Sequence, residues 1–167
     1  MNAASVLKYM VDKRIIKTTK RKTIEICKLV GSDVVFGLNF TNSILTSKDK
    51  IRYFNKYESF YILIVKPNFG CDTKNIYSKV KKFYKPYFNR PSKEMFSINF
   101  LKKTTNQLEP IVFSKYPKLK SIKLYLVNSC KPLLVRMTGS GSALVAYYKS
   151  NEKCKNAKKK FMEKYKN

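Results

Sequence analysis

The stretch "FYILIVKP", Phe60 to Pro67, constrains the fold more than any other part of the sequence. It is continuous and apolar, and it is rich in β-branched and aromatic residues, which is typical of a strand buried in a sheet. Neither this run nor any other reaches the roughly 20 apolar residues that a membrane-spanning helix needs. The sequence therefore predicts a β-sheet with residues 60–67 as its central strand.

A second constraint is the stretch "RMTGSGSALVAYY", Arg136 to Tyr148. Glycine occurs only 5 times in 167 residues, yet two glycines stand two apart here, between the apolar runs Leu133–Val135 and Ala143–Tyr148. The pattern predicts strand, tight loop and strand. A hairpin turn would use the glycines for positive φ, whereas a phosphate-binding loop would use them to expose backbone N–H groups to an anion. A lone Gly-x-Gly does not decide between the two, and the chain has no Walker-type Gly-Lys-Ser/Thr.

Apolar periodicity and capping residues place helices around these strands. We predict a helix over Asn2–Lys13 with Asn2 as its N-cap, and a second helix that Thr19 caps and Gly31 ends. The other predicted elements are two short strands around a polar turn at Ser47–Lys50, a helix from Asp72 or Thr73 to about Tyr84, a surface loop at Lys85–Met95, and helices at about Gln107–Phe113, Lys118–Ser129 and Glu152–Tyr165. This order predicts an α+β fold with helices on one face of an antiparallel sheet.

The charge of the chain has two explanations. Lysine and arginine number 36 against 10 acids, which gives a formal net charge of +26. Such a balance is typical of a protein that binds a polyanion. It is also the composition that an AT-rich genome imposes, with abundant Lys, Asn, Ile, Tyr and Phe and with no Trp or His. Because the charge is spread along the chain apart from Lys153–Lys166, we favour the second explanation.

The four cysteines argue against a metal centre. They form no Cys-x-x-Cys pair, and the chain has no histidine that could complete a zinc site; they are Cys27, Cys71, Cys130 and Cys154. We expect four ordinary thiols in a reducing, cytoplasmic setting. The N-terminal residues lack the apolar segment of a signal peptide.

Two further segments each have a structural and a functional interpretation. Asp33, in "GSDVVF", fits a helix cap or Asx-turn, which the local pattern favours, and it also fits a general base that takes a proton from a hydroxyl. In "NFGCDTKNIYSKV", the residues before Tyr77 fit a loop and helix N-cap, with Tyr77 in the core. The same residues could instead meet a phosphate at the helix start and present the Tyr77 ring to a base.

Taken together and in order, five segments resemble the GHMP kinases. They are "NAASVLKYM" near the start, "GSDVVF", "LIVKPNFGCDTKNIY", "NQLEP" at Asn106–Pro110, and "RMTGSGSALVAYY". The family's corresponding motifs are the helix after its ATP loop, G-[SA]-D-V-P-F, a strand with Pro, Thr and an aromatic residue, N-D-L-E, and M-[ST]-G-S-G-[SA]. The resemblance extends from Asn2 to about Phe161 and is to the branch that phosphorylates 4-diphosphocytidyl-2-C-methyl-D-erythritol.

The resemblance implies a small-molecule kinase. It would move the γ-phosphoryl group of ATP, with Mg²⁺, to the 2-hydroxyl of that substrate in isoprenoid precursor biosynthesis by the non-mevalonate pathway. Asp33 matches the family's catalytic aspartate, and Thr73 and Tyr77 match its substrate-binding residues, with Tyr77 against the cytosine ring. The residues that match the loop over the phosphates are Thr138, Gly139, Ser140, Gly141 and Ser142. No residue is implied as a resident metal ligand.

The differences between this sequence and the family's motifs lower the activity that we expect. Residues 1–57 correspond to part of the ATP-binding domain and 58–167 to the C-terminal domain, whereas the family's glycine-rich ATP loop falls upstream of Asn2. Val35, Gly37 and Gln107 differ from the family motifs, as does the turn at Ser47–Lys50. We therefore expect little or no turnover from the chain alone unless a separate chain supplies the loop. The alternative is a basic, non-enzymatic nucleic-acid binder derived from the kinase.

Overall fold

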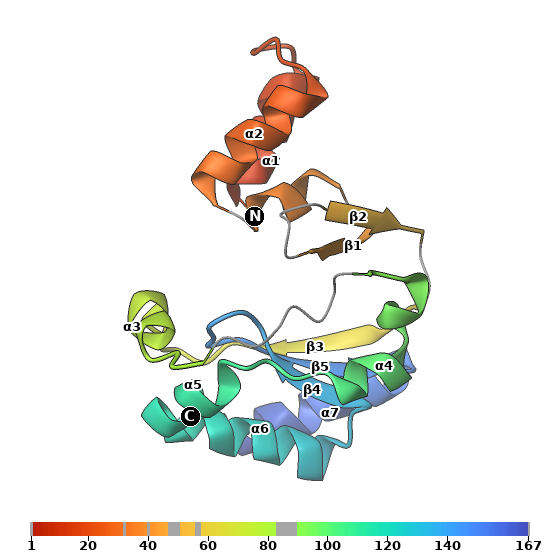
Figure 1. Cartoon of the computed structure of the whole chain (residues 1–167). Coiled ribbons are helices and arrows are strands. Elements are labelled where there is room, and N and C mark those ends of the chain that lie inside the picture. Colours follow the sequence, from red (N-terminus) through yellow and green to blue (C-terminus); the bar gives the residue numbers. More distant parts are fainter. Residues whose placement is uncertain are drawn as a thin grey trace. The chain divides into compact units, whose positions relative to one another are not determined.

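The computed structural model describes residues 2–31, 33–39, 41–46, 51–55, 58–82 and 90–166. They fall into two compact units, which Figure 1 shows with their helices and strands. The first unit is Met1–Tyr57 with Pro86–Lys93, and the second is Glu58–Lys85 with Glu94–Asn167. That these units correspond to the two kinase domains stays a prediction.

The first unit contains two helices, a short 3₁₀ helix and a hairpin. Its elements are α1 (Asn2–Asp12), α2 (Lys20–Val30), η1 (Val34–Leu38), β1 (Asn42–Leu45) and β2 (Ile51–Phe54). The predicted caps of α2 are confirmed, since the Thr19 hydroxyl accepts a hydrogen bond from the Lys22 N–H and the Gly31 N–H donates to the Cys27 carbonyl. Asn2 is already the first residue of α1, so its prediction as N-cap is off by one position.

Helix packing gives the first unit a small core. Ala4 of α1, Cys27 of α2 and Val35 of η1 are almost fully buried. β1 and β2 pair antiparallel from Asn42 opposite Phe54 onwards, which confirms the two predicted short strands. The predicted turn between them, Ser47–Lys50, lies outside the described residues.

The second unit is a three-stranded antiparallel sheet with helices. Its elements are β3 (Tyr61–Val65), α3 (Thr73–Ser78), η2 (Lys93–Phe96, which begins in the first unit), α4 (Ile98–Lys103), α5 (Glu109–Lys115), α6 (Pro117–Cys130), β4 (Leu134–Met137), β5 (Leu144–Tyr148) and α7 (Asn151–Lys164). The strand order is β3–β5–β4. Figure 1 shows α6 and α7 together on one side of this sheet. Two small antiparallel sheets combined with helices agree with the predicted α+β class.

Alternation along the strands divides the sheet into a core face and an outer face. The residues of the core face pack against α6 and α7 in one hydrophobic cluster that includes Val65, Val135, Met137, Leu144, Ala146, Tyr148, Leu126 and Ala157. On the outer face, Arg136 donates to the Thr104 hydroxyl and to the Leu101 carbonyl, and so ties β4 to the end of α4. None of the described helices has the length and apolarity that crossing a membrane requires.

The prediction that residues 60–67 form the central strand is wrong. β5 is central, and β3 lies at the edge of the sheet, paired with β5 alone among the described residues. The apolar run indicated burial on both faces, but Ile62 and Ile64, on the outer face, remain 50% and 58% exposed. β5 is the more buried strand, with four of its five residues buried.

One helix prediction also needs correction, and one helix was not predicted. α3 ends at Ser78 rather than near Tyr84, and the Ser78 hydroxyl donates to the Asn75 carbonyl, a local bond that competes with helix continuation. The four residues after it that the structure describes are not helical. α4, which begins at the Ser97 N-cap, was not predicted because it is only six residues long.

Candidate functional site

The glycine-containing segment between β4 and β5 is a tight hairpin turn. The Thr138 N–H donates to the Ala143 carbonyl at 2.9 Å, and the Gly141 N–H donates to the Thr138 carbonyl at 2.9 Å. The φ angles of Gly139 and Gly141 are +48° and +92°. The hairpin interpretation of the sequence is therefore confirmed, and both glycines occupy backbone conformations that other residues rarely adopt.

The two glycines are required for different reasons. A Cβ atom at Gly141 would lie 2.9 Å from the Cys71 sulfur and 3.2 Å from the Met137 sulfur, which is too close for ordinary contact. A Cβ atom at Gly139 would meet nothing within 4 Å. Gly139 is thus needed for its φ angle alone, whereas Gly141 also lets the turn pack against the loop that contains Cys71.

The motif "NQLEP" holds the turn from one side. The Asn106 side-chain amide donates to the carbonyls of Met137 and Gly139, at 2.9 and 2.7 Å. The Glu109 carboxylate accepts from the Met137 N–H at 2.9 Å and pairs with Lys123 through its other oxygen. Asn106 therefore supports the turn through hydrogen bonds to its main chain. The sequence alone does not reveal the role of Glu109, and its one available signal is an acid beside a helix-initiating proline.

The segment after β3 holds the turn from the other side. The buried Ser142 hydroxyl donates to the Phe69 carbonyl at 2.6 Å. The hydroxyls of Thr73 and Ser140 are hydrogen-bonded at 2.7 Å, and either can be the donor. The structure thus brings Thr73, a predicted substrate-binding residue, into direct contact with the predicted phosphate loop.

The amides at the tip of the turn are available to an anion. The N–H groups of Gly139 and Ser140 make no hydrogen bond to any residue that the structure describes. Gly139 is exposed and Ser140 partly so. Adjacent backbone N–H groups in a turn of this kind can form a concave anion site. The two interpretations of the glycine pair are therefore compatible in one turn.

Helix α3 places Tyr77 on the surface. The Asp72 carboxylate accepts from the Asn75 N–H at 3.1 Å and caps the helix, as predicted. Tyr77 is 56% exposed, so its interpretation as a core residue is wrong, and the neighbouring Ile76 occupies the core instead. An exposed ring on this helix is available for stacking.

Asp33 lies in the first unit, at the start of η1. Its carbonyl accepts from the Phe36 N–H, but its side chain makes no capping hydrogen bond to the helix. Asp33 therefore occupies the N-cap position, as predicted, but its carboxylate makes no capping hydrogen bond. The Asp33 side chain is exposed. Asp33 belongs to the first unit, whereas Thr73 belongs to the second.

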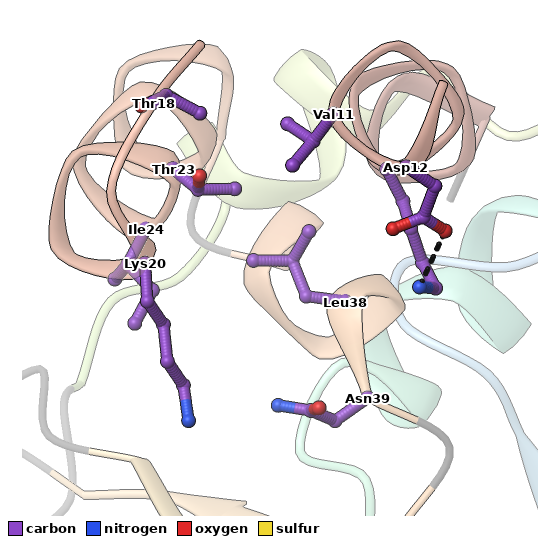
Figure 2. Close-up of a pocket in the computed structure, with 9 residues that line it drawn as sticks. Val11, Asp12, Thr18, Lys20, Thr23, Ile24, Leu38 and Asn39 are labelled. Carbon is purple, nitrogen blue, oxygen red and sulfur yellow. Dashed lines mark hydrogen bonds and ion pairs between the residues drawn. The ribbon is translucent and has the colours of Figure 1, made fainter. Parts of the chain in front are cut away.

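The first unit also contains a pocket of about 240 Å³ between α1, α2 and η1. Figure 2 shows Leu38 between Val11 on the α1 side and Ile24 on the α2 side. The dashed line in Figure 2 is the ion pair between Lys8 and Asp12, at 2.8 Å. Asp33 is not among the residues that line this pocket.

A second pocket, of about 450 Å³, lies beside the "NQLEP" motif in the second unit. Its lining includes Asn106, Glu109 and Phe113. Among the described residues, no group of three or more His, Cys, Asp or Glu side chains is arranged to hold a metal ion.

The chain was compared with known proteins by family models, curated sequences and solved structures. No family model matches it. No solved structure matches it either. Curated relatives do match, and the three described here are all named 4-diphosphocytidyl-2-C-methyl-D-erythritol kinase.

The relative from Pelagibacter ubique (strain HTCC1062) is 45% identical over 167 residues, which is 100% of this chain and 59% of the relative. Those from Clostridium tetani (strain Massachusetts / E88) and Petrotoga mobilis (strain DSM 10674 / SJ95) are 29% and 30% identical, over 98% and 86% of this chain and 61% and 58% of their own lengths. The chain thus spans about three fifths of the length of the curated relatives it matches. Over its whole length it is similar to part of the proteins named 4-diphosphocytidyl-2-C-methyl-D-erythritol kinase, the kind of kinase that its motifs resemble.

Proposed function

We propose that the chain provides substrate-binding and phosphate-binding parts of a 4-diphosphocytidyl-2-C-methyl-D-erythritol kinase. The observation that carries the proposal is the 45% identity to a kinase of that name along the entire chain. The direct contact of Thr73 with Ser140 supports it, because it joins two segments whose motifs are 67 residues apart. The comparisons give no support to the nucleic-acid alternative.

In the proposed reaction the 2-hydroxyl of the substrate attacks the γ-phosphorus of ATP, and ADP leaves. The Asp33 carboxylate accepts the hydroxyl proton as the new P–O bond forms. Because the protein makes few covalent bonds in phosphoryl transfer, most of the rate acceleration comes from positioning the reactants and stabilising charge.

The hairpin turn fits a phosphate group. Its N–H groups at Gly139 and Ser140 have no described partner, and Gly141 carries no Cβ that would meet the Cys71 sulfur. Mg²⁺ is usually held by phosphate oxygens, water and one or two carboxylates. We propose that it arrives with ATP and neutralises charge on the phosphates, without a resident cage of side chains.

Thr73 and Tyr77 are the proposed contacts to the cytidyl substrate. The Thr73 hydroxyl is exposed while it bonds Ser140, and it retains capacity for a second hydrogen bond. The exposed Tyr77 ring offers a stacking surface for a pyrimidine. The four free cysteines agree with a reducing, cytoplasmic setting for this biosynthetic step.

Phosphoryl transfer tests the proposal. ADP release is followed for the chain with ATP, Mg²⁺ and the cytidyl substrate, alone and mixed with a separate chain that carries a GHMP glycine-rich ATP loop. We expect Asp33→Asn to lower the rate by about 100-fold or more, the usual contribution of a general base. The matched control is Glu25→Gln, which removes an exposed acid of the same unit that pairs with Arg21.

The possible outcomes separate the parts of the proposal. Turnover that Asp33→Asn leaves unchanged would overturn the role of Asp33. No ADP release under either condition would overturn the kinase assignment of the chain.

A further inference from the structure

Two lysine ammonium groups bind residues of the segment that precedes and includes α3, which also supplies Thr73. Lys66 follows β3, and its Nζ donates to the carbonyls of Pro67 and Phe69 at 3.1 and 3.0 Å. The Phe69 carbonyl is the same group that accepts from Ser142 of the glycine turn. The Phe69 carbonyl therefore links the Lys66 ammonium group to Ser142 of the glycine turn.

Lys115 approaches from the end of α5. Its Nζ donates to the Asn75 side-chain oxygen at 2.7 Å, in the first turn of α3 and two residues after Thr73. It also lies 5.7 Å from the centre of the Tyr116 ring, and that ring stacks on Phe69 with centroids 5.8 Å apart. Phe69, whose main-chain carbonyl binds Lys66, thus stacks on the ring that Lys115 faces.

The positive charges of Lys66 and Lys115 both act on the Cys71 thiol, whose sulfur packs against the glycine turn. Burial raises the pKa of the Cys71 thiol, while the ammonium groups of Lys66 and Lys115 lower it. The Cys71 sulfur lies against Gly141, 2.9 Å from where a Cβ would stand. The positive potential of both lysines therefore extends to the glycine turn.

Neither lysine is neutralised by a carboxylate within the described residues. The ion pairs there join Lys8 to Asp12, Arg21 to Glu25 and Lys123 to Glu109. The acid closest in sequence to Lys66 is Asp72, whose carboxylate caps α3, and the acid closest to Lys115 is Glu109, which pairs with Lys123. An ammonium group has three donors, so Lys66 retains one and Lys115 retains two after the contacts above. Both side chains are exposed, and these donors can be offered to a bound molecule.

We propose that Lys66 and Lys115 form a positioning pair that binds a phosphate or diphosphate group beside the Thr73–Ser140 contact. This rests on the proposed function, which supplies two sources of the group: the diphosphate of the cytidyl substrate and the phosphates of ATP. Charge-assisted hydrogen bonds to phosphate are stronger than neutral ones. The pair would fix the anion while the Tyr77 ring remains free to meet a base.

The test is calorimetric titration of the full chain with inorganic diphosphate, CDP, ADP and cytidine. Lys66→Gln and Lys115→Gln each remove a charge but keep a hydrogen-bond donor. We expect each to weaken binding of inorganic diphosphate and CDP by about tenfold, which is the scale of one charge-assisted hydrogen bond, and to leave cytidine binding unchanged. Lys115→Arg should retain most of the affinity. The control is Lys153→Gln, in the first turn of α7, which follows the end of β5 farthest from the glycine turn.

Each outcome is decisive. If the two glutamine variants lose affinity equally for CDP and inorganic diphosphate but not for ADP, the pair binds the cytidyl substrate. If they lose affinity for ADP and inorganic diphosphate but not for CDP, the pair binds ATP. If binding of inorganic diphosphate depends on the lysines but neither CDP nor ADP binds more tightly than inorganic diphosphate, the pair is retained and the proposed function is overturned. Unchanged affinities in both variants, losses matched by Lys153→Gln, or no anion binding by the wild-type chain would overturn the pair.

Discussion

At the scale of single residues, Gly141 is the position of the turn that least tolerates a side chain. Its φ is +92°, and a Cβ there would clash with the sulfurs of Cys71 and Met137. We expect Gly141→Ala to lower the free energy of unfolding by about 2–3 kcal/mol, because steric overlap adds to the roughly 1 kcal/mol of backbone strain. Gly139→Ala is the matched variant, since its φ is also positive but its surroundings are open. Denaturant unfolding that ranks Gly139→Ala as the more damaging change would contradict this account of the turn.

The Cys71 thiol reports the electrostatics of the site. The thiolate is the form that reacts with alkylating agents, and it accumulates as the pH rises through the thiol pKa. Since Lys66 and Lys115 lower that pKa, removing either charge should raise it. We therefore predict that Lys115→Gln shifts the alkylation rate of Cys71 to higher pH, as followed by mass spectrometry of the Cys71 peptide.

The partly exposed thiol of Cys154, in α7, serves as the internal control for that experiment. A rate profile for Cys71 that stays in place when Lys115 is neutralised would show that the ammonium group does not act on the turn.

At the scale of elements, Asn106 joins the glycine turn to the start of α5. Its side chain donates to Met137 and Gly139 and accepts from the Leu108 N–H at 3.0 Å. Asn106→Ala would leave partly buried groups without their partners, so we expect a loss of about 2–3 kcal/mol in unfolding free energy. Gln107→Ala is the control, because Gln107 is exposed and adjacent. Hydrogen exchange should show faster exchange across residues 137–141 in the Asn106 variant only, and equal exchange in both variants would contradict the role of Asn106.

Local sequence signals predicted α2, the start of α3 and the turn between β4 and β5, because a chemical marker stands at each of them. Thr19 and Gly31 bound α2, Asp72 caps α3, and the glycine pair marks the turn between β4 and β5. The order of strands was not predictable, because an apolar run indicates a strand but not its neighbours. The exposed outer-face residues Ile62 and Ile64 gave "FYILIVKP" the pattern of a central strand, although β5 holds that position.

The candidate site was predictable in its parts but not in its connections. The resemblance indicated Thr73 and the glycine loop separately. Their hydrogen bond, and the positions of Lys66 and Lys115, depend on how the loop after β3 packs against the turn and α5. Contacts between residues so distant in sequence leave no local pattern, and lysines are too frequent in this chain for two of them to attract notice.

At the scale of the whole molecule, the proposed function requires that the second unit recognises a cytidine diphosphate group. Calorimetric titration of the full chain with CDP measures this recognition, with Tyr77→Leu to remove the exposed ring. Tyr61→Leu is the control, because Tyr61 is similarly exposed but pairs with Tyr148 at the end of β3 farthest from the glycine turn. We predict that the wild-type chain binds CDP, that Tyr77→Leu weakens binding by about tenfold through lost stacking, and that Tyr61→Leu has no effect. Absence of CDP binding by the wild-type chain, or equal affinity in Tyr77→Leu, would contradict the claim.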